Sequence, residues 1–240
     1  MNTTSREAGR NHGPLRSFGR RRARKLTSRQ STLLDSGLQR YRIDLSSPTP
    51  SRLELMFHQP VDEVWLEIGF GGGEHLLWQA EHHPKVGFVA CEPFIDGVAK
   101  VMDGIVTNQL ENVRIHADDA RDVLPWLPPA SIARVFILFP DPWPKKRHIK
   151  RRLVQPALIA DLARVVRAGG ELRLATDIPD YARGMLQAVR REGSFRWTAR
   201  GPQDWRNRPA DWPATRYEQK ALREGRACHF LRFKRLPRSP

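Results

Sequence analysis

The sequence of 240 residues contains only two cysteines, Cys91 and Cys228, and they stand far apart without the CxxC spacing of a zinc site. This scarcity argues against a disulfide framework and against a structural metal centre. No apolar run approaches the roughly 18 residues that cross a bilayer, and no hydrophobic signal segment opens the chain. We therefore expect a cytoplasmic protein with no metal and no membrane partner.

Acidic residues are also few: 26 Asp and Glu stand against 41 Lys and Arg, a formal net charge of +15. The excess is concentrated at residues 1–30, which hold nine Lys or Arg and one Glu. Such a surface attracts phosphate polyanions through long-range fields and counterion release, so we predict a nucleic-acid partner. Residues 1–32 lack apolar periodicity and are predicted to form a basic, disordered RNA-binding arm, with an organelle transit peptide as the competing interpretation.

From residue 61 onward, strand-like and helix-like segments alternate, which predicts an α/β fold: a doubly wound, mainly parallel Rossmann-like sheet with helices on both faces. We expect it to form one domain over residues 33–240, with ligands at the carboxyl ends of the strands. Two later segments predict a further strand, at the edge or in the interior of the sheet, and a functional surface loop. The expected strands are 61–68, 86–92, 113–117, 134–139, 171–176 and 227–235, the helices 74–82, 95–106, 120–127, 151–167 and 180–191, the turn 168–170 and the loop 201–220.

The segment LEIGFGGGEH places Glu67 at the end of a strand and Gly69, Gly71 and Gly73 in GxGxG spacing before a helix. Glycines there let the backbone turn tightly and approach a ligand closely. A dinucleotide-binding dehydrogenase would hold a pyrophosphate over that helix, but Glu67 and Glu74 on either side would repel it. A cationic ligand without phosphate fits better, which favours S-adenosyl-L-methionine.

The next two expected strands also end in acids. Glu92 in ACEP is placed to accept hydrogen bonds from ribose hydroxyls, and Asp119 in ADDA from an adenine amino group. A single acid at such a position is more often a helix cap. Three acids in order behind a glycine loop favour a cofactor site.

The segment FILFPDPWPKKRHIKRR, residues 136–152, leads from an apolar strand into a turn stiffened by prolines, followed by one His and six Lys or Arg. Many methyltransferases that act on nucleobase nitrogens carry an acid or amide, a proline and an aromatic ring at the end of the fourth strand. We predict that Asp141 accepts hydrogen bonds from a base edge and that Trp143 stacks on the base or walls its pocket. The alternative is that Asp141 caps a helix and Trp143 fills a crevice.

Together, LEIGFGGG, CEPF, LFPDPWPKKRHIKRR, ATD and TRYE resemble the bacterial tRNA (guanine-N7-)-methyltransferase family over roughly residues 15–235. The resemblance implies methyl transfer from S-adenosyl-L-methionine to N7 of the guanosine at position 46 of the tRNA variable loop. It implies that Glu67, Glu92, Asp119 and Asp141 surround the methyl donor and the reaction centre. It also implies substrate contacts by Lys145, Asp177, Thr215, Arg216, Tyr217 and Glu218, and RNA contacts by Arg147, His148, Lys150, Arg151 and Arg152. Pro144 stands where some members carry histidine, so no catalytic role is expected there.

Guanine N7 has a free lone pair and no proton to lose, so the reaction needs alignment and charge stabilisation rather than a strong base or a nucleophilic Cys or Ser. Asp141, or Asp177 at the end of the fifth strand, would bind the N1–H and N2 amino edge of guanine. Two alternatives stay open: another nucleobase-nitrogen RNA methyltransferase, and a nucleic-acid-binding protein with an inactive methyltransferase-like core. The sequence leaves open the tRNA species modified and whether the protein is a monomer or a homodimer.

Overall fold

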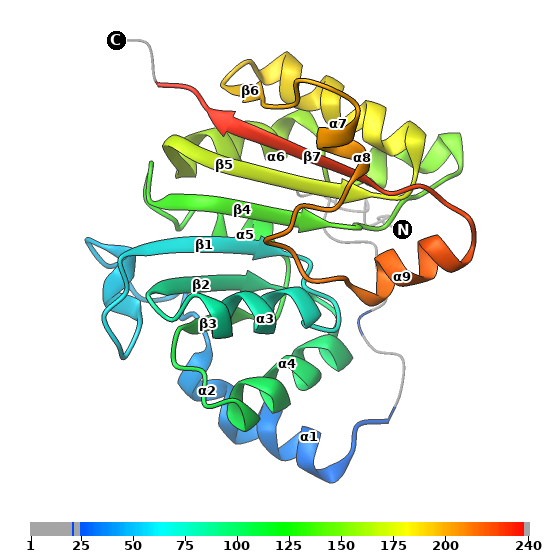
Figure 1. Cartoon of the computed structure of the whole chain (residues 1–240). Coiled ribbons are helices and arrows are strands. Elements are labelled where there is room, and N and C mark those ends of the chain that lie inside the picture. Colours follow the sequence, from blue (N-terminus) through cyan, green and yellow to red (C-terminus); the bar gives the residue numbers. More distant parts are fainter. Residues whose placement is uncertain (1–20, 22–24, 238–240) are drawn as a thin grey trace, which may run out of the picture.

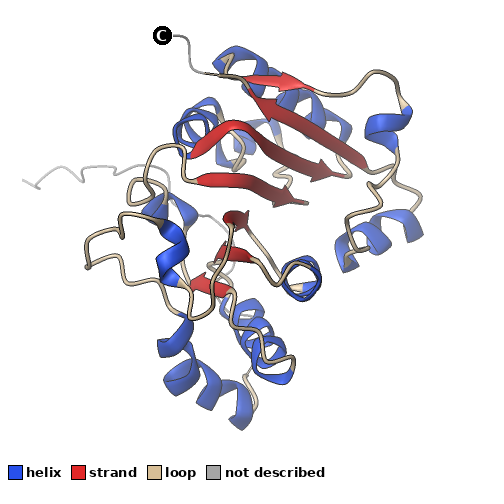
Figure 2. Ribbon diagram, turned by 60° about the vertical axis from the view of Figure 1, so that its left-hand side comes forward, coloured by secondary structure: helices blue, strands red, loops and turns tan. Residues whose placement is uncertain are grey.

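The computed structural model describes residues 21 and 25–237. Within these residues, seven strands form one twisted sheet with helices packed on both of its faces (Figures 1 and 2). In sheet order the strands are β3 (Val113–His116), β2 (Val86–Cys91), β1 (Glu63–Ile68), β4 (Ile132–Leu138), β5 (Val166–Thr176), β7 (His229–Arg235) and β6 (Phe195–Trp197).

The pairing of the strands is mainly parallel, as predicted. Neighbours from β3 to β5 are parallel, whereas β7 runs antiparallel to both β5 and β6. The strand expected at 227–235 therefore lies inside the sheet. Because β1 to β5 point the same way, their carboxyl ends meet at one edge, where ligands of doubly wound sheets bind.

The helices form two layers that bury separate apolar clusters. On one face, α3 (Glu74–His82) and α4 (Ile95–Thr107) lie over β1, β2 and β3, with Met102 and Phe88 in one cluster (Figure 1). On the other face lie α5 (Ala120–Val123), α6 (Pro156–Val165) and α7 (Pro179–Glu192), with Ile159 and Met185 in the second cluster. The predicted α/β fold with helices on both faces is confirmed.

Several boundaries differ from those predicted. The helix expected at 151–167 begins at Pro156, whose fixed φ suits the first helical turn, and the basic stretch before it forms the 3-10 helix η3 (Lys146–Arg151). The turn expected at 168–170 lies within β5, which begins at Val166. The loop expected at 201–220 contains α8 (Gln203–Arg206) and the first five residues of α9 (Arg216–Arg223).

The described residues before the sheet are also helical in part: α1 (Ser28–Thr32), the π-helix η1 (Leu33–Gly37), α2 (Leu38–Tyr41) and the 3-10 helix η2 (Leu53–Met56). The end of the predicted arm is therefore ordered, because Thr27 and Gln30 form a capping box and Arg29 pairs with Asp103 of α4 at 2.6 Å. Residues 1–20 and 22–24 of the arm lie outside the described residues. Among the described residues, no helix is long and apolar enough to span a bilayer.

Candidate active site

A cavity of about 350 Å³ opens at the carboxyl ends of β1, β2 and β4. Its wall contains side chains or backbone of several residues that the sequence singled out: Gly69, Gly71, Glu92, Asp119, Asp141, Trp143, Arg151 and Tyr217. These residues come from separate stretches of the chain and meet because the parallel strands end together. The cavity is the candidate site.

The glycine loop between β1 and α3 has the backbone that its sequence predicts. Gly69, Gly71 and Gly73 have φ values of 80°, 53° and 84°, a region that other residues enter at a cost. The loop also touches α4 closely, since a Cβ placed on Gly97 would lie 2.2 Å from the carbonyl oxygen of Gly71. Gly73 does not line the cavity but forms the N-cap of α3.

Glu92 is held in one orientation at the end of β2. The residue is buried, its Oε2 accepts a hydrogen bond from the Gly71 backbone at 2.7 Å, and its Oε1 accepts one from the Phe94 backbone at 2.9 Å. Burial raises the pKa of Glu92, and the two backbone donors oppose that rise. Each carboxylate oxygen keeps a lone pair for a further donor, so Glu92 is fixed in place and still able to bind a ligand.

Asp119 both caps a helix and lines the cavity. Its Oδ1 accepts from the backbone of Arg121 at 3.0 Å, at the start of α5, and its Oδ2 accepts from Arg121 Nη2 at 2.6 Å. The residue is buried, and Arg121 lies beside it in the cavity wall. The capping and ligand-binding interpretations are therefore compatible at this position.

The Asp141 carboxylate lies in the turn after β4, where it faces the cavity. It forms no hydrogen bond or ion pair with any other described residue, and it does not cap a helix. Although the residue reaches solvent, the protein atoms around its carboxylate remove part of its hydration and raise its pKa. Asp141 therefore has acceptor capacity that a ligand can use.

The turn that carries Asp141 is strained and clamped. Phe139 and Trp143 have φ values of 50° and 41°, conformations that cost non-glycine residues of order 1 to 3 kcal/mol each and gather at functional sites. The Arg152 side chain clamps the turn to α7. Its Nε donates to the carbonyl of Pro142 at 2.9 Å, and its Nη2 pairs with Asp180 of α7 at 2.9 Å.

Some residues of the basic stretch after the turn are exposed to solvent, and others contact the turn. Arg147 and Lys150 are exposed on η3, and Arg151 lies over the Trp143 ring with its Cζ 5.1 Å from the ring centroid. His148 packs edge-on to Trp143, with the ring centroids 5.7 Å apart. The position of Arg152 differs from that expected of an RNA contact, because its side chain is only 5% exposed and is engaged in the clamp.

Glu67 does not line the cavity, which differs from the expectation for this acid. Its side chain is buried, and its Oε2 accepts from His75 Nδ1 at 2.7 Å. Gln79 lies 3.2 Å from the other ring nitrogen of His75 and donates to the carbonyl of Asp211 at 2.8 Å. The sequence analysis missed this buried series of hydrogen bonds, although the position of His75 just past the glycines was a signal for it.

Among residues 215–218, Tyr217 lines the cavity while its neighbours hold α9 in place. Thr215 caps the helix by accepting from the Glu218 backbone at 3.2 Å. Arg216 pairs with Glu74 of α3 at 2.5 Å, and Glu218 pairs with Arg208 at 3.0 Å. Tyr217 lies against the glycine loop. Its helix, α9, lies beyond the arrowheads of β4 and β5 (Figure 1).

The other two predicted substrate contacts lie outside the cavity wall. Asp177, directly after β5, pairs with Arg226 Nε at 2.7 Å, a partner that the sequence did not indicate. Lys145 is exposed at the start of η3. Among the described residues, no cluster of three or more His, Cys, Asp or Glu side chains could hold a metal ion.

Comparisons of sequence identify relatives of the chain. A family model described as "Putative methyltransferase" matches residues 62–231. A tRNA (guanine-N(7)-)-methyltransferase of Rhodospirillum rubrum is 48% identical over 93% of this chain and 89% of the relative. Enzymes of the same name from Rhodopseudomonas palustris and Ruegeria pomeroyi are 45% and 48% identical, over 97% and 93% of this chain and 92% and 96% of the relatives.

Solved structures share the fold at low sequence identity. The 16S rRNA methyltransferase KamB aligns with a TM-score of 0.51 and 16% identity, over 74% of this chain and 89% of that protein. The [4+2]-cyclase SpnF aligns with a TM-score of 0.51 and 13% identity, over 87% of this chain and 95% of that protein. At such identities the similarity establishes the Rossmann-like architecture alone.

Proposed function

Because the chain belongs to the tRNA (guanine-N(7)-)-methyltransferase family, we propose that it transfers a methyl group from S-adenosyl-L-methionine to N7 of a guanosine in tRNA. The observation that carries the proposal is the Asp141 carboxylate, which has no partner among the described residues and faces the same cavity as Glu92 and the glycine loop. We expect the reaction in the cytoplasm, where its tRNA substrate is found.

The residues of the cavity fit the proposed methyl donor. Glu92 is oriented by two backbone donors and can accept from ribose hydroxyls, while Asp119 offers an acceptor to an adenine amino group. The acids suit a ligand that carries positive charge and no phosphate. When bound, S-adenosyl-L-methionine supplies a methyl carbon activated by its sulfonium.

The same cavity offers a place for the acceptor base. The N1–H and N2 amino group of guanine are donors, and Asp141 has unused acceptors for them. Its negative charge also stabilises the positive charge that grows on the purine as N7 is methylated. N7 carries its own lone pair, so Asp141 orients the base and stabilises charge without removing a proton.

The turn around Asp141 suits a base presented by a loop. Trp143 supplies an aromatic face next to Asp141, and exposed Arg147 and Lys150 lie nearby to contact phosphates. An unpaired base reaches such a site without the energy needed to leave a duplex stack. This geometry suits a base presented by a loop, and the choice of the guanosine at position 46 of the variable loop follows from the family resemblance.

The test is methylation of an unmodified tRNA transcript with a methyl-labelled donor, followed by nucleoside analysis and mapping. We expect label in 7-methylguanosine at position 46, and none in a transcript that carries adenosine there. Label in a methylated adenosine would favour the alternative of another nucleobase-nitrogen RNA methyltransferase. If the protein failed to bind S-adenosylhomocysteine in a calorimeter, the inactive-core alternative would replace the proposal.

A further inference from the structure

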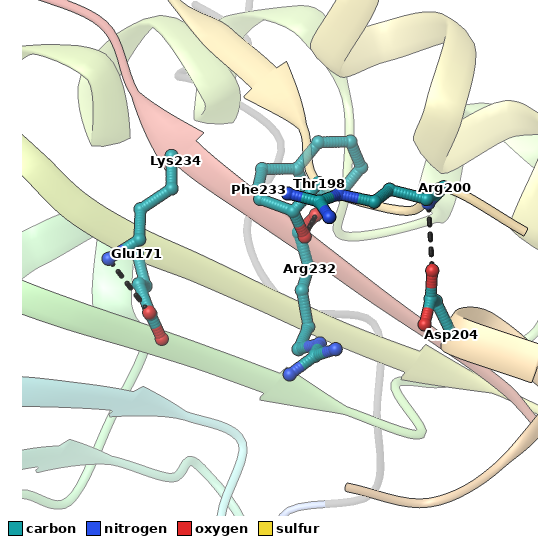
Figure 3. A pocket seen from close by; sticks show the side chains of 7 residues that line it. All are labelled: Glu171, Thr198, Arg200, Asp204, Arg232, Phe233 and Lys234. Carbon is teal, nitrogen blue, oxygen red and sulfur yellow. Dashed lines mark hydrogen bonds and ion pairs between the residues drawn. The ribbon is translucent and has the colours of Figure 1, made fainter.

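A second hollow, of about 390 Å³, lies beside β5 and β7 (Figure 3), and none of its lining residues lines the cavity of the candidate active site. It is formed by β5, β7 and the chain from β6 to α8, and its lining residues are Glu171, Thr198, Arg200, Asp204, Arg232, Phe233 and Lys234. On this face, α3 and α4 cover β1 to β3 (Figure 1), whereas charged side chains stand over β5 and β7. Arg173, opposite Arg232, lies three residues before the end of β5, roughly 10 Å from the edge that holds the cavity.

The strand register places like charges directly opposite each other on this face. Arg173 of β5 pairs in register with Arg232 of β7, and Arg196 of β6 pairs in register with Lys234 of β7. Like charges at directly opposite positions destabilise a sheet. Two such pairs side by side concentrate positive charge on this face, and Glu171, which faces Lys234 in register, is the acid between them.

Carboxylates neutralise only part of this charge. Glu171 pairs with Lys234 at 2.9 Å and with Arg173 at 2.7 Å, and Arg173 also pairs with Asp211. The guanidinium groups of Arg196, Arg200 and Arg232 form no ion pair with a carboxylate of the described residues.

The single negative charge of Asp204 offsets only part of the positive charge of Arg196, Arg200 and Arg232. Its Oδ2 accepts from the backbone of Arg200 at 2.8 Å and of Gly201 at 3.1 Å, and these bonds lower the pKa of Asp204 more than the nearby Arg232 and Arg200 charges do. This carboxylate therefore shapes the turn between β6 and α8. The guanidinium groups keep their donors for a ligand.

The backbone beneath these cations is fixed. Arg232 is paired with β5 on one side, and on the other its carbonyl accepts from both the backbone and the hydroxyl of Thr198, at 3.0 and 2.9 Å. A cation that projects from a fixed backbone loses less freedom on binding than one in a mobile loop. Arginine also presents a planar fork of donors that matches phosphate oxygens.

We propose that this basic face, defined by Arg196, Arg200, Arg232 and Lys234, binds the phosphodiester backbone of tRNA at a place apart from the methyl-transfer cavity. The proposal rests on the proposed function, since tRNA is the polyanion that the enzyme must hold. Cations spread over neighbouring strands suit a chain of repeated phosphates better than a single small anion. The face would position the body of the tRNA while the cavity receives one base.

The test measures tRNA affinity at several salt concentrations for the double variant Arg200→Ala/Arg232→Ala. The slope of log affinity against log salt should shrink by about 0.7 to 0.9 for each phosphate that the variant no longer binds, and S-adenosylhomocysteine affinity should be unchanged. The single-turnover rate at saturating tRNA should stay close to that of the wild type. The matched control Arg190→Ala/Arg191→Ala removes the same charge from the last turn of α7 and should leave the slope unchanged.

The melting temperature shows whether each variant is folded, and Arg196→Ala/Arg200→Ala, at two exposed positions, repeats the test without touching a central strand. The variant Arg232→Lys keeps the charge and should retain most of the slope. An unchanged slope in both double variants, or an equal decrease in the control, would overturn the proposal. So would a change in sedimentation with an unchanged slope, since the face would then join copies of the chain. Failure of the wild type to form 7-methylguanosine would instead contradict the proposed function.

Discussion

In the proposed reaction, Asp141 is the residue to which we assign the most direct part in the chemistry. It faces the cavity with no partner among the described residues, while Glu92 in the same cavity is fixed by two backbone donors. A group that stabilises charge must be held in place before the reaction, and the hydrogen bond from Arg152 to the Pro142 carbonyl holds the turn that carries Asp141.

We expect Asp141→Ala to lower the single-turnover rate of 7-methylguanosine formation by about 100-fold or more, comparable to the removal of one preorganised electrostatic contact. Affinity for tRNA should stay near that of the wild type, because the phosphate contacts are made elsewhere. Quench-flow measurements at saturating tRNA and donor give the rate. A variant with full activity and an unchanged melting temperature would remove Asp141 from the catalytic site.

Glu171 gives a prediction for pH dependence. Partial burial opposes its ionisation, but Arg173, Lys234 and Arg134 outweigh burial and lower its pKa to about 2. A carboxylate whose pKa falls on folding stabilises the protein above its unfolded pKa of about 4.5 and loses that effect as pH falls towards 2. We expect Glu171→Gln to lower the unfolding free energy by about 1 kcal/mol at pH 7, after allowance for solvent screening, and by less at pH 3. Urea unfolding at both pH values measures the difference, and a gap independent of pH would contradict the assignment.

Where backbone position alone decides the outcome, the sequence predicted which residues come together, while their roles in binding and catalysis stay predictions. Glu92, Asp119 and Asp141 follow parallel strands, so the fold must bring them to one edge. The sequence predicted the surroundings of a residue less well where they depend on the direction of its side chain. The Glu67 side chain points to His75, eight residues later, and the Arg152 side chain points inward to the carbonyl of Pro142, ten residues earlier. Strand-end position does not determine whether such a side chain points into the cavity or toward a neighbouring loop or helix.

At the scale of elements, we infer that Arg152, which holds the Asp141 turn, has a different role from the exposed cations of the same basic stretch. We expect Arg152→Ala to lower the unfolding free energy by about 1 to 3 kcal/mol and to slow methyl transfer, because the carbonyl of Pro142 loses its donor and the turn loosens. The salt dependence of tRNA binding should not change. The matched variant Arg147→Ala/Lys150→Ala should do the opposite, reducing the salt slope with a normal rate at saturating tRNA. Equal salt slopes in both variants would show that this division is wrong.

The contact between α4 and the glycine loop gives another prediction. Alanine normally stabilises a helix relative to glycine, but a Cβ at Gly97 would lie 2.2 Å from the Gly71 carbonyl oxygen, and backbone cannot move aside cheaply. We expect Gly97→Ala to destabilise the protein by about 1 to 3 kcal/mol and to weaken S-adenosylhomocysteine binding.

Gly184 of α7 provides the control for Gly97, since a Cβ there meets only Arg152 Nη1 at 3.9 Å. Gly184→Ala should stabilise the protein by about 0.4 to 1 kcal/mol, by restricting the unfolded chain. Thermal unfolding and calorimetry measure both variants. Stabilisation of similar size at both positions would mean that the glycine loop moves freely away from α4.

For the molecule as a whole, alternation of strands and helices was enough to predict a mainly parallel sheet, because strands buried on both faces need crossover helices. This alternation did not predict which strands neighbour β7, since pairing between distant segments leaves no local signal. The short helices α8 and α9 were predicted as a loop for a similar reason. They are set by caps such as Thr215 and by ion pairs such as Arg216 with Glu74, rather than by apolar periodicity.

The last prediction concerns the basic segment before the fold. Arg21 pairs with Asp118, the neighbour of Asp119, and its carbonyl accepts from the Ile95 backbone at 3.0 Å, so the chain enters the described structure close to the cavity. Residues 1–20 carry four Arg against one Glu. We therefore expect deletion of residues 1–20 to weaken tRNA binding and to shrink its salt slope by about 0.7 to 0.9 for each phosphate no longer bound, with S-adenosylhomocysteine affinity unchanged. Replacing the four arginines by glutamine in the full chain should reproduce the effect if charge is the cause. If the deletion leaves the salt slope as it was, the segment does not bind RNA phosphates, and the rest of the net charge must hold the tRNA.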